Sequence, residues 1–239
     1  MKIFFAGGEH IRTSNCLIGK RILVSYFNTR KQKDIELYRE RAKEIFLDSG
    51  AFTAFTKNIE ISIEEYIDYL LETKGKWDYI AGLDVIGNAE ETKKHCDKMK
   101  EAGLNPIPTF HFGEDYSFLE DYCKNYNYIA LGGVAQLRTY PRVSAWLDSC
   151  FSKIKNYWPK KVHGFAITGE RYMKRYPFYS VDSTSWLAGE KFNQVMGIKD
   201  GSIYRPLHYE KRNEKNIEYF LKLENEVTKL WEKKGVKWE

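Results

Sequence analysis

Short apolar segments alternate with amphipathic segments along most of this chain. Runs of apolar, β-branched or aromatic residues that are bounded by Gly, Asp or Asn are typical of buried strands. Such runs predict strands at Ile3–Ala6, Ile22–Tyr26, Ile45–Asp48, Tyr79–Val85, Ile107–Phe112, Tyr128–Gly132, His163–Thr168 and Tyr179–Asp182.

Most of the segments between these runs have helical periodicity. Ser62 and Glu65 form a capping box in front of apolar residues at 3–4 spacing, and Asn88 is placed to cap a helix over Glu90–Ala102. Further helices are predicted at Asp115–Asn125, Pro141–Tyr157, Arg171–Tyr176, Ser185–Val195 and Glu214–Lys234. The first crossover, Gly7–Arg21, has turn residues without a clear helical stripe, and Gly197–Asn213 is predicted to be a loop.

Strands that alternate with helices in this way predict an α/β protein with a parallel sheet. We expect a compact (β/α)8 barrel of the TIM type, a single domain over 1–239 in which 214–234 form a C-terminal helical extension. A doubly wound open sheet is the alternative. Both folds bind ligands at the carboxyl ends of their strands, so both predict the same location for a functional site.

Composition narrows the class of protein. A chain of 239 residues with 43% hydrophobic and 30% charged residues is typical of a soluble globular protein, and its start lacks the apolar region of a secretory signal. We therefore expect a cytoplasmic protein without a membrane partner, in the host cytoplasm if a phage encodes it. The four cysteines are widely separated and lack the CxxC spacing of structural zinc sites, which predicts free thiols. A net charge of +5 permits a polyanionic partner without requiring one.

Polar groups follow four of the predicted strands. Asp48, Asp84, the pair Gly132-Gly133 and Asp182 all stand at strand ends, where parallel strands would direct them to one cavity. Two carboxylates that flank one pocket can divide the roles of nucleophile and acid or base, as in glycosyl transfer. A third carboxylate can accept hydrogen bonds from a purine edge, and adjacent glycines leave backbone N–H groups open to a flat ligand.

Each of these signals also has an ordinary structural explanation. A strand-end Asp often caps a helix or turn, and Gly-Gly is common in tight turns. His111 and His163 lie in apolar runs and fit core or pocket-lining positions. A metal-dependent barrel hydrolase with Asp48, His111, His163 and Asp182 as ligands is a further alternative, although the chain lacks an HxH pair.

Four motifs taken together resemble one enzyme family. They are Leu47-Asp48-Ser49-Gly50-Ala51-Phe52, Gly82-Leu83-Asp84, Leu131-Gly132-Gly133-Val134-Ala135 and Ser180-Val181-Asp182-Ser183-Thr184-Ser185-Trp186. In this order they are similar to the tRNA-guanine transglycosylase superfamily, and closest to its short phage branch, which inserts 7-deazaguanine derivatives into DNA. The matches span roughly residues 45–186.

The resemblance implies a (β/α)8 barrel that exchanges guanine for a 7-deazaguanine through a covalent glycosyl-enzyme intermediate, without a redox or nucleotide cofactor. It implies Asp182 as the nucleophile and Asp48 as the general acid and base. The residues that it places around the purine are Ser49, Asp84, His111, Gly132, Gly133 and His163. The sequence departs from the tRNA enzymes in lacking their Cys-x-Cys-x-x-Cys zinc site, so we expect no metal and favour DNA over tRNA as the substrate.

A base in a duplex must be flipped out before it reaches such a pocket, and helper proteins that open the duplex would fit this requirement. Phe52, Phe112 and Trp186 are candidates to stack on the base. Cations that cluster in predicted loops and in the tail are candidates for phosphate contact: Arg138, Arg142, Arg171, Lys174, Arg175, Lys211 and Arg212. An ordinary solvated basic surface, or a barrel that binds nucleic acid without catalysis, would show the same clusters.

Overall fold

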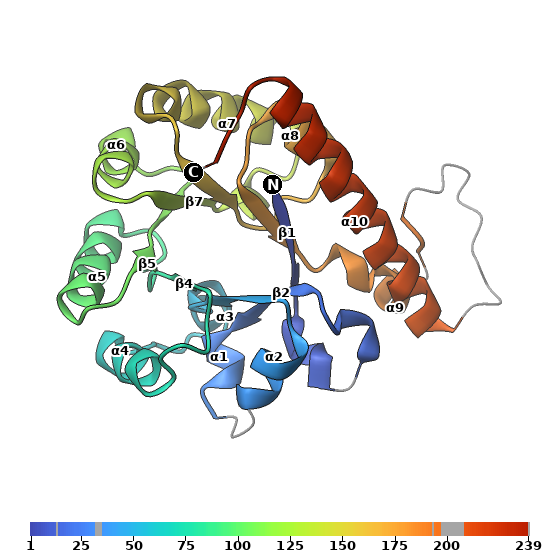
Figure 1. Ribbon diagram of the computed structural model, residues 1–239. Helices are drawn as coiled ribbons and strands as arrows, with labels where there is room; N and C mark the ends of the chain where they lie inside the picture. The colour runs from blue at the N-terminus through green and yellow to red at the C-terminus, as the bar shows by residue number, and fades with distance from the viewer. Residues whose placement is uncertain (13, 32–34, 193, 197–207, 239) are drawn as a thin grey trace.

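Parallel strands surrounded by helices form the centre of the molecule (Figure 1). The computed structural model describes residues 1–12, 14–31, 35–192, 194–196 and 208–238. The strands are β1 Lys2–Ala6, β2 Arg21–Ser25, β3 Glu44–Asp48, β4 Tyr79–Ala81, β5 Pro106–Ile107, β6 Thr109–His111, β7 Tyr128–Gly132, β8 Lys161–Gly164 and β9 Ser180–Ser183. Their order, β5-β4-β3-β2-β1-β9-β8-β7-β6, defines one parallel sheet that curls into a barrel of the TIM type, as predicted.

The two edges of this sheet meet at Pro108. β5 pairs with β4 and β6 pairs with β7, yet one residue separates β5 from β6. Pro108 has no N–H to donate to the ladder, but its carbonyl oxygen accepts from Ala130 N at 2.8 Å. The segment predicted as one strand, Ile107–Phe112, therefore joins both edges, and the sheet is nearly closed into a barrel.

Side chains alternate between two cores. The cluster inside the barrel contains Phe4, Ala6, Leu23, Phe46, Ala81, Ile107 and Ala130. Their neighbours along the strands, such as Ile3, Ile45 and Ile129, belong to the larger cluster between the sheet and the helices. This alternation has the period of two that a pleated strand imposes, so it fixes which strand residues face the inside of the barrel.

Helices cover the outside of the barrel and are placed close to the predicted segments. They are α1 Tyr26–Thr29, α2 Ile35–Arg41, α3 Ala51–Thr56, α4 Ile63–Glu72, α5 Ala89–Glu101, α6 Tyr116–Asn125, α7 Tyr140–Ile154, α8 Glu170–Arg175, α9 Ala188–Phe192 and α10 Tyr209–Lys233. Ser62 and Asn88 cap α4 and α5 as predicted, since their side chains accept from Glu65 N and Glu91 N. Among the described residues, no helix is long and apolar enough to cross a membrane.

The crossover at Gly7–Arg21, predicted to have turn residues without a clear helical stripe, contains two short 3-10 helices, η1 Gly8–Arg12 and η2 Asn15–Leu17. Some predicted helix boundaries are wrong. Further short helices are η3 Val134–Gln136, η4 Lys155–Tyr157 and η5 Ser185–Leu187, and the helix predicted over Ser185–Val195 is divided into η5 and α9. The last helix begins at Tyr209 rather than Glu214, and the rest of the predicted loop, 197–207, lies outside the described residues.

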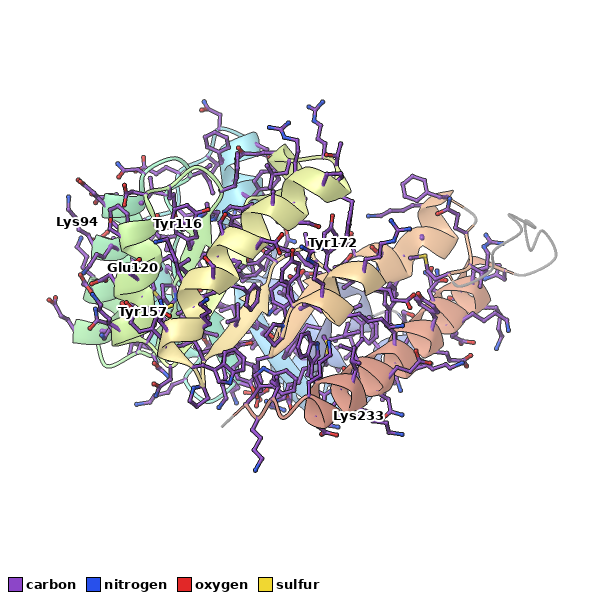
Figure 2. All side chains as sticks on the ribbon, turned by 90° about the horizontal axis from the view of Figure 1, so that it is seen from above. Lys94, Tyr116, Glu120, Tyr157, Tyr172 and Lys233 are labelled. Atoms are coloured by element: carbon purple, nitrogen blue, oxygen red, sulfur yellow. The ribbon has the colours of Figure 1, made fainter. Side chains whose placement is uncertain are left out.

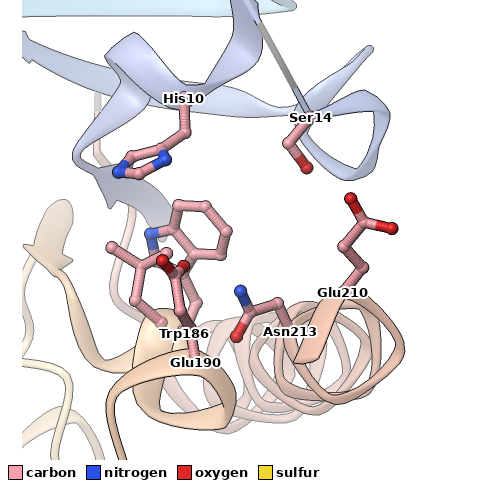
Figure 3. A pocket seen from close by; sticks show the side chains of 7 residues that line it. His10, Ser14, Trp186, Glu190, Glu210 and Asn213 are labelled. Atoms are coloured by element: carbon pink, nitrogen blue, oxygen red, sulfur yellow. The ribbon is translucent and has the colours of Figure 1, made fainter. Parts of the chain in front are cut away.

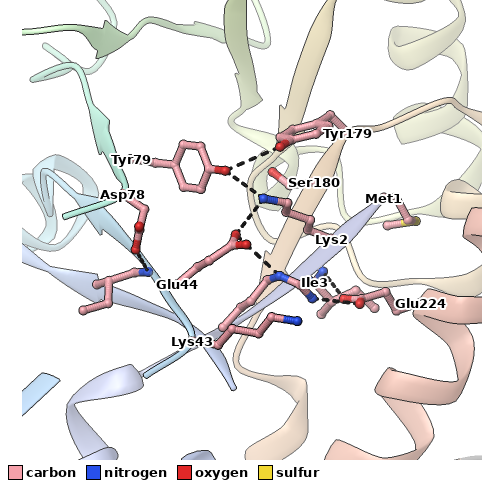
Figure 4. Close-up of polar contacts among 12 residues, drawn as sticks. Met1, Lys2, Ile3, Lys43, Glu44, Asp78, Tyr79, Tyr179, Ser180 and Glu224 are labelled. Carbon is pink, nitrogen blue, oxygen red and sulfur yellow. Dashed lines mark hydrogen bonds and ion pairs between the residues drawn. The ribbon is translucent and has the colours of Figure 1, made fainter. Parts of the chain in front are cut away.

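The C-terminal helix α10 is tied to the start of the barrel (Figure 4). The carboxylate of Glu224 accepts from Ile3 N at 2.6 Å and from Arg21 Nη1 at 2.8 Å. At the same end of the barrel, Lys2 Nζ donates to Glu44 at 2.7 Å and to the Tyr79 hydroxyl at 2.8 Å. This polar network lies at the amino-terminal end of the barrel, opposite the carboxyl ends of the strands where a site is expected.

Candidate functional site

Asp48 and Asp182 both face the inside of the barrel at the carboxyl ends of their strands. Asp48 follows Phe46 by two positions in β3, and Asp182 in β9 is the register partner of Phe4 in β1. Phe46 and Phe4 belong to the inner cluster, so the period of two directs both carboxyl groups inward. The sequence motif alone left open whether these two groups share a region.

The pKa of Asp48 responds to both Asp84 and Asp182, so the three carboxyl groups lie within electrostatic reach of one another. Burial is the largest of the effects that raise the pKa of Asp48 to about 7, and the nearby carboxylates of Asp84 and Asp182 act in the same direction, with a smaller effect from Glu9. The Gly50 N–H, which donates to Asp48 Oδ2 at 2.9 Å, opposes this rise. A carboxyl group with a pKa near 7 can donate and accept a proton at neutral pH, which suits a general acid and base.

Asp182 is held by one of its two oxygens. Its Oδ1 lies 3.2 Å from His163 Nε2 and accepts from Ala166 N at 3.1 Å. Ala166 has a φ of +57°, a conformation that is strained for a residue with a side chain and that here directs its N–H at the carboxylate. The side chain of Asp182 is only 8% exposed, and the bonds to Oδ1 leave Oδ2 as the oxygen available to a ligand.

His163 and Ser49 lie behind the surface that a ligand could reach. His163 is fully buried, with its ring centroid 4.6 Å from that of Phe46 and 4.5 Å from that of Phe165. Ser49 is also buried, and its hydroxyl accepts from Ala51 N at 3.4 Å at the start of α3. Neither residue is in position to contact a substrate directly, in contrast to the sequence-based expectation.

The third strand-end carboxylate, Asp84, is paired with a histidine. Asp84 Oδ2 lies 3.4 Å from His111 Nε2, and Glu114 Oε1 lies 3.3 Å from His111 Nδ1. Burial lowers the pKa of His111, but Asp84 and Glu114 outweigh burial and raise it to about 10. His111 is therefore an imidazolium between two carboxylates. Asp84 Oδ1 is buried and has no hydrogen-bond partner among the described residues.

Glu114 was not identified from the sequence. It follows His111 by three residues, its side chain is 7% exposed, and its Oε2 accepts from His111 N at 2.8 Å. Gly113, with a φ of +96°, turns the chain between them. The sequence signal that could have identified Glu114 is Gly113, which lies between His111 and Glu114 directly after a strand.

Gly132 and Gly133 allow close packing beneath His111. A Cβ on Gly132 would lie 2.9 Å from Thr109 Cγ2 and 3.1 Å from His111 Cδ2, so a side chain does not fit. Gly133 has a φ of +80°, which favours glycine. The pair thus lies next to the predicted base-binding residues, and Gly132 is required by the protein's own packing.

The predicted phosphate-contacting cations fall into three groups. Arg138, Arg142 and Arg171 are exposed, and we find no ion pair to them among the described residues. Others are already paired with carboxylates, namely Lys174 with Glu170, Arg175 with Asp148 and Lys211 with Glu214. Arg212 is buried, and its Nε donates to Gly189 O at 2.9 Å, so its guanidinium is directed into the protein rather than to a nucleic acid.

The exposed Arg171 belongs to an aromatic stack that sequence reasoning missed. Its guanidinium carbon lies 5.5 Å from the Tyr140 ring centroid, and Tyr140 stacks on Tyr172 with centroids 5.0 Å apart. The stack joins the first turns of α7 and α8, and Figure 2 labels Tyr172 between these helices. Both helices follow strands, so their amino-terminal ends lie on the same side of the barrel as the acids. We call Arg138, Tyr140, Arg142, Arg171 and Tyr172 the arginine rim.

The aromatic residues proposed to stack on a base differ in their exposure. Phe52 on α3 is 59% exposed, and Phe112 is partly buried against Trp146. Trp186 is 1% exposed, and its Nε1 donates to Ala6 O at 2.8 Å. The expectation that Trp186 stacks on a base is therefore wrong, because its indole is part of the packing outside the barrel.

A cavity of about 220 Å³ lies beside Trp186, between η1 and α10 (Figure 3). Its polar lining includes His10, Glu190 and Asn213. It is separate from the inner acids, since Trp186 packs in the layer between the sheet and the helices.

The metal-dependent alternative requires several ligands in one place. Among the described residues, no group of three or more His, Cys, Asp or Glu side chains could hold a metal ion. His163 pairs with Asp182, whereas His111 pairs with Asp84, so the four proposed ligands do not form one set.

Comparison with known proteins does not assign this chain to a family. No protein-family model matches the chain, and no curated protein is detectably similar to it.

Proposed function

We propose that this protein is a transglycosylase that exchanges guanine in DNA for a 7-deazaguanine derivative. The observation that carries the proposal is the pair of inward-facing carboxyl groups. Asp48 has a pKa of about 7, and the nearby Asp182 is held by Oδ1 alone. Two carboxyl groups in contrasting environments can act as acid and nucleophile at one sugar carbon.

In the first step, Asp182 Oδ2 attacks C1′ of the deoxyguanosine, and a C–O ester bond forms as the N-glycosidic bond breaks. The electron pair of that bond leaves with the purine, and Asp48 supplies the proton that neutralises it. The products are free guanine, an ionised Asp48 and the sugar bound covalently to Asp182.

In the second step, the incoming 7-deazaguanine loses its N9 proton to the Asp48 carboxylate, and its N9 attacks C1′. The ester bond breaks and returns its electron pair to Asp182, so both acids recover their starting states. Two inversions at C1′ restore the original anomer. One group must donate a proton in the first step and accept one in the second, and a pKa of about 7 permits both.

Asp84 is the residue that we assign to the purine edge. Its Oδ1 is an acceptor without a partner among the described residues, and the N1–H and amino groups of guanine are donors. The His111 imidazolium between Asp84 and Glu114 keeps a positive charge beside this carboxylate. An ionised Asp84 is needed because a protonated carboxyl group accepts less well from a purine edge.

The arginine rim supports a polyanionic substrate. It combines three exposed arginines with a tyrosine stack, a pairing of cations and aromatic rings that binds unpaired strands. DNA is proposed because the sequence resembles the phage branch and lacks the cysteine cluster of the tRNA enzymes.

The test offers radiolabelled guanine in DNA and in tRNA, with several 7-deazaguanines, and measures label release. We expect repeated release from DNA only when a 7-deazaguanine is present. When the second base is omitted, release should stop at about one guanine per enzyme, and a denaturation-resistant protein–DNA adduct should accumulate. Asp182→Asn should abolish both while it retains the fold, and the surface variant Asp148→Asn should not. Release from tRNA alone would replace DNA as the substrate, and an active Asp182→Asn would remove the nucleophile.

A further inference from the structure

We propose that His163 is a positioning residue for Asp182, and that Ser180 and Tyr128 hold its imidazole in the required tautomer. The role in turnover rests on the proposed function, because it takes Asp182 as the nucleophile. The arrangement of the side chains does not depend on it.

The four side chains form one chain of contacts inside the barrel. His163 Nε2 lies 3.2 Å from Asp182 Oδ1, and its Nδ1 lies 2.5 Å from Ser180 Oγ. The Tyr128 hydroxyl contacts the same Ser180 Oγ. They come from the neighbouring strands β7, β8 and β9, with Tyr128 and Ser180 at the strand starts and Asp182 nearer the carboxyl ends.

Donor and acceptor chemistry fixes the direction of the bonds. An ionised Asp182 can only accept, so His163 Nε2 carries the hydrogen. In a neutral imidazole Nδ1 is then the acceptor, which requires the Ser180 hydroxyl to donate to it. With its hydrogen used in this way, the Ser180 oxygen can accept from the Tyr128 hydroxyl. Each bond therefore sets the direction of the next.

Aromatic packing keeps the imidazole from turning. Phe46 lies against one face of the ring at an interplanar angle of 32°, and Phe165 meets it edge-on at 75°. His163 has no exposed surface, so it acts on the substrate only through Asp182.

The consequence for Asp182 is a carboxylate with one fixed and one available oxygen. Donation by His163 and by Ala166 N fixes Oδ1, which prevents the group from rotating and leaves Oδ2 to face the sugar carbon. Correct orientation of a nucleophile affects the rate of attack more than substrate affinity. The loss of His163 should therefore lower kcat and leave KM nearly unchanged.

The first experiment compares His163→Leu with His163→Gln. Leu removes the donor, whereas the Gln amide can place an N–H near the former Nε2. Outer partners that orient metal ligands are typically worth about 10–100-fold in activity, and we expect the same scale for a partner that orients a nucleophilic carboxylate. We expect His163→Leu to lower kcat about 100-fold with KM within about threefold, and His163→Gln to recover part of the loss. Ser180→Ala should lower kcat about 10-fold, and His95→Gln on α5 serves as the histidine control.

Three kinetic results would overturn the proposal. They are normal turnover in His163→Leu, equal losses in the Leu and Gln variants, or a loss confined to KM, which would place His163 against the substrate. Ser180→Ala retains the imidazole itself, so it tests the same role if the His163 variants do not fold.

A second experiment does not require activity. Nitrogen NMR of the His163 imidazole distinguishes its two neutral tautomers and the imidazolium form. We expect the Nε2–H tautomer in the wild type and a mixture of tautomers in Ser180→Ala. A wild-type ring protonated at Nδ1, or at both nitrogens, would overturn the tautomer assignment. If the ring is as expected but no base is exchanged, the proposed function fails and the hydrogen-bond chain stands.

Discussion

Replacement of Asp48 by Asn should stabilise the protein above neutral pH. The pKa of Asp48 is raised from 3.8 to about 7 in the folded chain, chiefly by burial and then by Asp84 and Asp182. An Asn amide is neutral at every pH, and its oxygen can still accept from Gly50 N. The variant therefore removes the cost of a partly buried negative charge and retains the local hydrogen bond.

The sign and size of this effect follow from proton linkage. Below about pH 4, Asp48 is protonated in both the folded and the unfolded chain, so its ionisation does not affect stability. Between about pH 4 and pH 7 the unfolded chain loses this proton and the folded chain retains it, which costs about 1.4 kcal/mol of stability per pH unit. Above pH 7 the cost is fully present at about 4 kcal/mol, and Asp48→Asn should recover it.

The assay is urea unfolding of both proteins between pH 4 and pH 9, with the difference in unfolding free energy plotted against pH. We expect a difference near zero at pH 4 that grows to about 4 kcal/mol in favour of the variant by pH 8. Asp148→Asn is the control, and it should lower the unfolding free energy rather than raise it. Burial raises the pKa of Asp148, but the Arg175 ion pair and the Tyr176 hydroxyl outweigh burial and hold this pKa below its usual value. A difference that does not change with pH, or a less stable Asp48→Asn at pH 8, would refute the environment that we assign to Asp48.

Two further predictions concern the proposed reaction. The rate of base exchange should decline above about pH 7, because Asp48 must carry a proton to protonate the leaving guanine. Asp84→Asn should move this decline to lower pH, because the loss of a neighbouring negative charge lowers the pKa of Asp48. A pH–rate profile of each protein measures the shift, and an unchanged decline would exclude Asp48 as the acid. Arg171→Gln should weaken binding to single-stranded DNA, and it should reduce the slope of the logarithm of the binding constant against the logarithm of the salt concentration by about 1. Arg175→Gln on the same helix is the control. It should have little effect, because Asp148 already pairs with that arginine. Fluorescence anisotropy at several salt concentrations tests this, and equal losses would contradict the arginine rim.

The sequence was sufficient to predict the barrel and the strands that carry its acids because both depend on local patterns. Apolar runs with turn residues at their ends identified the strands, and Ser62 and Asn88 identified helix starts through their own side chains. The inward direction of Asp48 follows from the alternation along β3, since Phe46 precedes it by two residues.

Other features depend on how distant elements pack. Tyr140 meets Tyr172 only because α7 and α8 lie side by side, and the sequence contains no pattern that pairs them. The burial of Arg212 results from the position of α10 against α9, which the composition of the tail could not reveal. Cations that are close in the sequence thus differ in their surroundings, and carboxylate partners or burial decide which ones remain available to a polyanion.

The apolar core inside the barrel affects both proposed catalytic groups, Asp48 and Asp182. Phe46 belongs to the apolar cluster that fills the barrel and also lies against the ring of His163. An apolar interior beneath the acids excludes water, and burial is the main cause of the raised pKa of Asp48. The same interior makes an unpaired polar group costly, so the side chains that orient Asp182 must satisfy one another through the contacts among Tyr128, Ser180 and His163. The raised pKa of Asp48 and the fixed orientation of Asp182 are therefore consequences of one arrangement of packed side chains inside the barrel.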